Sequence, residues 1–68
     1  MTRAELRACG PFWMDFSHEK NMYGVECSNP PNGGHYILFV PNDEDGSIST
    51  EIANILNSAL NFPRGTGR

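Results

Sequence analysis

The sequence has no long apolar run, few basic residues and only two cysteines. No stretch approaches the roughly 20 apolar residues that a membrane-spanning helix needs, so we expect no membrane partner. The N-terminal residues include Glu5 and lack an apolar stretch, which indicates no signal peptide and predicts a cytoplasmic protein. The 68 residues suffice for one domain with a thin core. Their hydrophobic fraction, 38%, is too high for a disordered chain.

Basic residues are nearly absent from the centre of the sequence. Four of the five are arginines in the first seven or the last five residues, and the fifth is Lys20. Positions 8–63 contain seven acidic residues beside Lys20, which gives this part a net charge of −6. A surface of that sign repels phosphate, so we expect no direct nucleic-acid binding. It favours a partner protein or complex with a basic surface, unless the acids only keep a small domain soluble.

Short-range patterns predict two helices and three strands. Thr2 and Glu5 have the spacing of a capping box, which predicts a short helix at 3–9. A second helix begins near Ser47 or Ser49, either of which is expected to cap it. Its apolar stripe is expected to be Ile52, Ile55, Leu56, Ala59 and Leu60. Alternating apolar residues predict strands at 12–17, 22–27 and 35–40.

These elements predict an α+β fold, a three-stranded antiparallel meander with the C-terminal helix packed on one face. Three short strands need a second layer to be stable, and the helix supplies it. We expect residues 1–63 to form a single small domain and residues 64–68 to form a flexible tail.

Strand alternation divides the apolar residues between two faces of the sheet. The face toward the helix is expected to hold Phe12, Met14, Phe16, Tyr23, Val25, Tyr36, Leu38 and Val40. The opposite face keeps an aromatic patch of Trp13, Ile37 and Phe39, which indicates an interaction surface. Its cover is left open: the N-terminal residues Leu6 and Ala8, a second copy of the chain, or a partner.

Cys9, His18, Cys27 and His35 are the residue types that bind zinc. No two of them lie within four residues of each other, whereas structural zinc sites take ligand pairs from tight turns, so we expect no metal and no cofactor. A disulfide between Cys9 and Cys27 is conceivable, but a cytoplasmic chain is expected to keep both thiols reduced.

An acidic loop formed by Asp43, Glu44 and Asp45 precedes the second helix and resembles the calcium loop of an EF-hand. With Gly46 at the sixth position of such a loop, the first ligand position falls on Pro41 and the twelfth on a residue without a carboxylate. We therefore interpret this stretch as a strand-to-helix turn whose acids bind a partner.

The sequence gives little support to catalysis. Cys27 could act as a nucleophile beside His18 or His35, but no oxyanion hole or third orienting group is indicated. Phosphate loops, dinucleotide fingerprints and paired-carboxylate motifs are absent from the sequence. We expect no catalytic residues and no enzyme activity, because the core is too small to preorganise a site.

The chain resembles the short orphan proteins encoded by phages and mobile elements, in its size, its acidic centre, its strand-rich body and its closing segment 51–61. That class includes anti-CRISPR and other anti-defence inhibitors. The resemblance implies a non-enzymatic inhibitor in the cytoplasm of a bacterial host, which blocks a nucleic-acid-handling defence complex.

The sequence thus predicts that an acidic and aromatic surface binds the partner, through Asp43, Glu44, Asp45, Trp13, Ile37 and Phe39. The alternative is a structural or accessory module that forms a homodimer and inhibits nothing. In that case the aromatic patch would be buried across a two-fold interface.

Overall fold

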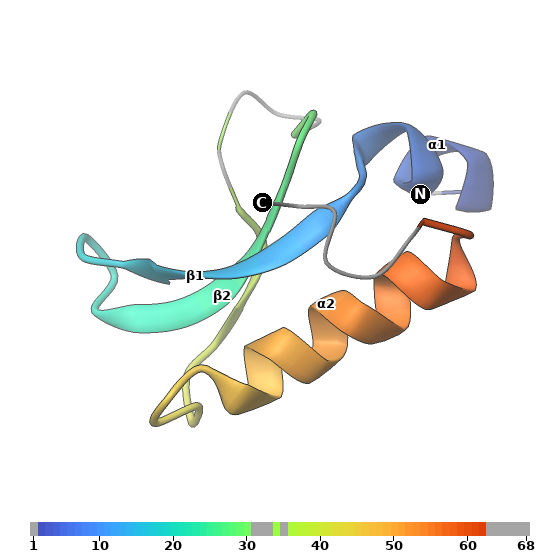
Figure 1. Cartoon of the computed structure of the whole chain (residues 1–68). Coiled ribbons are helices and arrows are strands. Elements are labelled where there is room, and N and C mark those ends of the chain that lie inside the picture. Colours follow the sequence, from blue (N-terminus) through green and yellow to red (C-terminus); the bar gives the residue numbers. More distant parts are fainter. Residues whose placement is uncertain (1, 31–33, 35, 63–68) are drawn as a thin grey trace.

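The computed structural model describes residues 2–30, 34 and 36–62, and these have the predicted α+β architecture. An antiparallel sheet with the strand order β1-β2-β3 carries one long helix on one face, and a short helix lies at its end (Figure 1). The predicted tail at 64–68 and His35 lie outside the described residues. The elements are α1 (Arg3–Cys9), β1 (Phe12–Ser17), β2 (Met22–Cys27), β3 (Tyr36–Val40) and α2 (Ser47–Ala59).

Helix α1 has the predicted capping box and packs against the end of α2. The Thr2 hydroxyl accepts the Glu5 amide at 3.1 Å, and the Glu5 carboxylate accepts the Thr2 amide at 2.8 Å. Leu6 packs against the core, and the Arg7 guanidinium lies 4.7 Å from the centroid of the Phe62 ring. Tertiary contacts therefore hold this seven-residue helix, which is too short to be stable alone.

The β1–β2 hairpin joins the first two predicted strands. Phe12 lies opposite Cys27 and Ser17 lies opposite Met22, so residues 18–21 form the connection. The Ser17 hydroxyl accepts the amide of Lys20 at 3.1 Å, which ties the loop to the end of the strand.

A β-bulge in the β2–β3 ladder changes the predicted orientation of two residues. Val25 pairs with Leu38 but Glu26 pairs with Tyr36, so Ile37 is an extra residue on β3. Ile37 and Leu38 both pack against the core, and Tyr36 moves to the opposite face. The prediction that Tyr36 faces the helix and Ile37 faces away is therefore wrong, because an inserted residue reverses the alternation of a strand.

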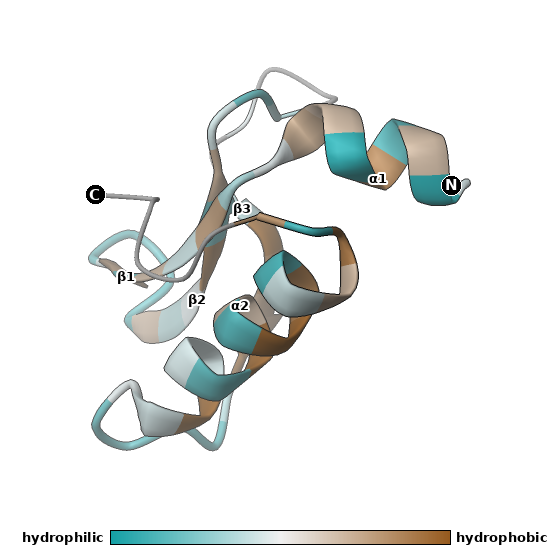
Figure 2. Cartoon of the chain, turned by 45° about the vertical axis from the view of Figure 1, so that its right-hand side comes forward, coloured by the Kyte–Doolittle hydropathy of each residue, from teal (hydrophilic) through white to brown (hydrophobic). Residues whose placement is uncertain are grey.

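Three members of the predicted apolar stripe, Ile52, Leu56 and Leu60, pack in or against the core, whereas the other two, Ile55 and Ala59, are exposed. Ser49, Ala53 and Asn57 are the buried residues of the helix, whereas Ile55 is 56% exposed. The side-chain amide of Asn57 accepts the Phe12 amide and donates to the Phe12 carbonyl, both at 2.8 Å. This pairing places a polar residue of α2 against the edge of β1. Figure 2 shows hydrophobic and hydrophilic residues on different sides of α2.

The core lies between α2, β1, β2 and the end of α1. Phe12 and Val25 are completely enclosed, with exposed fractions of 1% and 0%. The buried hydrophobic residues of this cluster are Cys9, Phe12, Val25, Cys27, Ala53 and Leu60.

Candidate protein-binding surface

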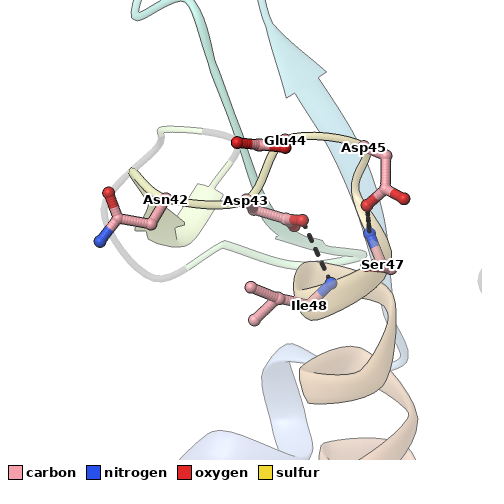
Figure 3. Close-up of a pocket in the computed structure, with 6 residues that line it drawn as sticks. All are labelled: Asn42, Asp43, Glu44, Asp45, Ser47 and Ile48. Atoms are coloured by element: carbon pink, nitrogen blue, oxygen red, sulfur yellow. Dashed lines mark hydrogen bonds between the residues drawn. The ribbon is translucent and has the colours of Figure 1, made fainter.

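The acidic loop before α2 uses two of its three carboxylates within the chain. The buried Asp43 carboxylate accepts the amides of Gly46, Ile48 and Ser49 at 3.0, 3.2 and 2.7 Å. Asp45 accepts the amide of Ser47 at 3.0 Å (Figure 3).

These contacts correct the predicted helix start. Gly46 occupies the N-cap position of α2 with a φ of 84°, and it makes no side-chain cap hydrogen bond. Asp43 satisfies the free amides in place of Ser47 or Ser49. A left-handed φ favours glycine at the cap, and Asp43 reaches the amides from three residues before it.

Both carboxylates are stabilised in the ionised form. Burial works against ionisation of Asp43, but hydrogen bonds from Ser49, Ile48 and Gly46 outweigh it and lower the pKa of Asp43. Hydrogen bonds from Ser47 likewise lower the pKa of Asp45. Asp43 therefore supports the start of α2, and Glu44 is left as an exposed acid of the loop.

We predict that Asp43→Asn lowers Tm by about 4–8 °C at pH 7, because asparagine keeps one acceptor oxygen but places an NH2 group against an amide that the second carboxylate oxygen accepts. A carboxylate whose folded pKa is lowered stabilises the fold above its unfolded pKa of about 3.9, and this contribution disappears as the pH falls through the folded value. The difference between the wild type and the variant should therefore shrink during acidification below about pH 4. Thermal melts followed by circular dichroism from neutral to acidic pH measure it.

Glu44→Gln is the matched control, because it removes the same charge from an exposed neighbour. An equal loss of Tm in this variant would show that loop charge, and not the cap, stabilises the helix start.

The face of the sheet opposite α2 gathers aromatic and acidic side chains. Across β1 and β2, Trp13 lies opposite Glu26 and Asp15 lies opposite Gly24. On β3, Phe39 pairs with Gly24, and the bulge brings Tyr36 opposite Glu26. We name this surface the acidic aromatic face, and its members are Trp13, Asp15, Glu26, Tyr36 and Phe39.

The side chains of this face are held in place by one another. The Trp13 indole donates to the Glu26 carboxylate at 2.9 Å. The centroids of the Tyr36 and Phe39 rings lie 4.8 Å apart with a tilt of 30°. A Cβ atom on Gly24 would lie 3.0 Å from the Tyr36 ring and 3.1 Å from the Phe39 ring, so both rings pack closely against the glycine backbone.

Among the described residues, the charged members of the face, Asp15 and Glu26, are both acidic. Burial raises the pKa of Tyr36, and the carboxylates of Asp15 and Glu26 raise it further. The strand register places both carboxylates on the same face of the sheet as the phenol. The central basic residue, Lys20, is exposed in the hairpin loop, away from the middle of the strands.

Leu6 and Ala8, which were one predicted cover of the aromatic patch, lie elsewhere. Leu6 packs against the core on the α2 side, and Ala8 is exposed. Phe39 is 36% exposed, and Trp13 and Tyr36 are half-buried.

Two members of the predicted aromatic patch, Trp13 and Phe39, lie on this face. Tyr36 lies there in place of the third predicted member, Ile37, which packs against the core. Strand alternation places Asp15 and Glu26 on this face, so both can be assigned to it from the sequence alone. Tyr36 could not be assigned without the bulge.

Within residues 2–30, 34 and 36–62, no group of three or more His, Cys, Asp and Glu side chains could hold a metal ion. His35, one of the four zinc-type residues, lies outside that set, and Cys9 and Cys27 are buried free thiols. None of the described helices combines the length and apolar character needed to cross a membrane. Comparisons with protein-family models, curated proteins and solved structures find no match to this chain.

Proposed function

We propose that the protein is a small non-enzymatic binding module whose acidic aromatic face binds a basic segment of a partner protein. The observation that supports this most is the clustering of three aromatic rings and two carboxylates on a sheet face to which neither described helix is packed. Aromatic residues are enriched at the energetically dominant positions of protein interfaces. The carboxylates give such a surface a preference for positive charge.

Arginine suits this face better than lysine. Its planar guanidinium stacks on aromatic rings and forms paired hydrogen bonds with a carboxylate, whereas the lysine ammonium is more strongly hydrated and has no planar surface. Tyr36 and Phe39 offer ring surface beside Asp15 and Glu26. We therefore expect a partner segment that contains arginine.

Tryptophan fluorescence tests the proposal directly, because Trp13 is the single tryptophan of the chain and a member of the face. The probes are three short peptides of equal length, in which the same positions hold arginine, lysine or glutamate. Only the arginine and lysine peptides should change the emission, and the arginine peptide should bind more tightly. Equal responses to all three peptides, or none, would contradict the proposal.

Phe39→Ala should weaken binding of the arginine peptide at least about tenfold, the effect expected when one well-packed anchor is removed. The control is Ile55→Ala, which removes a more exposed apolar side chain from the outer side of α2. The two variants should have similar melting temperatures. Equal affinities for the peptide would place the binding surface elsewhere.

The inhibitory role implied by the resemblance to phage-encoded proteins is a more specific form of the same proposal. An acidic surface could occupy the basic channel through which a bacterial defence complex holds nucleic acid. Glu44, in the acidic loop, would add charge at the margin of such a contact. A purified defence complex should lose DNA binding at stoichiometric amounts of the wild type and keep it with the Phe39→Ala variant.

A homodimer through the same face is the second candidate, since aromatic patches are often buried between copies of a chain. A two-fold interface would bring the like charges of Asp15 and Glu26 toward their own copies, which disfavours it. Light scattering that detects a dimer dependent on Phe39 would support this candidate over a basic partner.

A further inference from the structure

Cys9 and Cys27 end two different elements and come together in the core. Cys9 is the last residue of α1, and Cys27 is the last residue of β2. The Asn29 amide donates to the Cys9 carbonyl at 2.9 Å, so the chain after β2 runs beside the end of α1. Both cysteines are 5% exposed and belong to the same hydrophobic cluster.

The two thiols interact with each other and with the backbone. The Cys9 thiol donates to the Glu5 carbonyl at 3.3 Å. Burial raises the pKa of Cys27, and the charge and hydrogen bond of the neighbouring Cys9 thiol raise it further. Both thiols are protected while the fold is closed, because both side chains are buried and the raised pKa of Cys27 disfavours its reactive thiolate form.

We propose that Cys9 and Cys27 are a reversible oxidation site, which low-molecular-weight disulfides convert to an intramolecular disulfide that ties α1 to the sheet. One cysteine thiolate attacks the reagent disulfide, forms a mixed disulfide and releases one reagent thiolate. The second cysteine thiolate then attacks the protein sulfur of that mixed disulfide and releases the other reagent thiolate. Two protein thiols are oxidised, one reagent disulfide is reduced, and the two thiol protons go to the released thiolates or to solvent.

Local opening of α1 gives the reagent access to the pair. This helix has seven residues and depends on tertiary contacts, such as the Arg7–Phe62 contact, so it is expected to open before the sheet. The finished disulfide closes a loop between α1 and β2, and such a loop restricts the unfolded chain more than the folded one. Oxidation should therefore stabilise the domain.

The experiment treats the full chain with oxidised glutathione and measures intact mass, free thiols and Tm. The expected result is a monomer that has lost two hydrogen atoms and both titratable thiols, with Tm raised by about 5 °C or more. Reduction with dithiothreitol should restore the original mass and Tm.

Cys9→Ser and Cys27→Ser are the control variants, and each should give a glutathione adduct or no reaction, without a rise in Tm. A wild type that retains its thiols, that accumulates a stable glutathione adduct or an intermolecular dimer, or whose Tm falls on oxidation would overturn the proposal.

Discussion

Asn57→Leu is expected to lower the free energy of unfolding by about 2–5 kcal/mol, because it leaves two buried backbone groups without partners. The Asn57 amide hydrogen-bonds both the N–H and the C=O of Phe12, and it is 2% exposed. Leucine has a similar size, so the packing volume is nearly kept while both hydrogen bonds are lost. A domain of this length has a total stability of roughly 3–10 kcal/mol. The variant should therefore be largely unfolded well below the melting temperature of the wild type.

Urea denaturation followed by circular dichroism measures this loss. Asn54→Leu is the matched control, since Asn54 is half-buried on the same helix and the substitution is identical. It should change the free energy of unfolding by about 0.5 kcal/mol or less. Equal losses in the two variants would show that leucine at either position of α2 lowers the free energy of unfolding, and that the lost hydrogen bonds to the Phe12 backbone are not the cause.

Asn57 also shows why the buried face of α2 could be predicted only in part from the sequence. Hydrophobic periodicity identified the helix, because apolar residues recur at helical spacing. It could not show that an asparagine would complete the hydrogen bonds of an edge strand 45 positions away. Buried polar residues satisfy partners that only the folded chain brings together.

The elements themselves were accessible from short-range signals. The capping box at Thr2 and Glu5 and the alternation at 12–17 and 22–27 are local patterns, and the structure confirms the helix and the strands that they predict. The bulge at Ile37 is different, because it depends on how β3 meets β2. One inserted residue was enough to exchange the faces of Tyr36 and Ile37, and so to change the composition of the candidate site.

The acidic loop shows a similar limit for charge patterns. Its composition indicated a surface feature, yet the Asp43 carboxylate is buried and occupied by amides of α2. The sequence shows an acidic residue near a helix start, but the distances from its carboxylate to the helix amides decide whether it caps the helix or faces solvent. The acidic side chains of the proposed binding surface lie on the sheet, where Asp15 and Glu26 share a face with Tyr36.

Gly24 affects both the stability of the sheet and the geometry of the acidic aromatic face. A Cβ atom at this position would lie 2.5 Å from the Leu38 carbonyl oxygen, which is backbone of the neighbouring strand. It would also meet the rings of Tyr36 and Phe39 at 3.0 and 3.1 Å. Alanine can be accommodated only if β3 moves away from β2, and both rings must also shift slightly.

We predict that Gly24→Ala lowers the free energy of unfolding by about 1–3 kcal/mol, the usual cost of overpacking. It should also weaken binding of the arginine peptide, since Tyr36 and Phe39 can no longer rest on the strand. Gly34→Ala is the control, because a Cβ atom there would meet no atom within 4 Å. Urea denaturation and Trp13 fluorescence measure the two effects. If Gly24→Ala were as stable as Gly34→Ala and bound the peptide equally well, the close packing of both rings on Gly24 would be refuted.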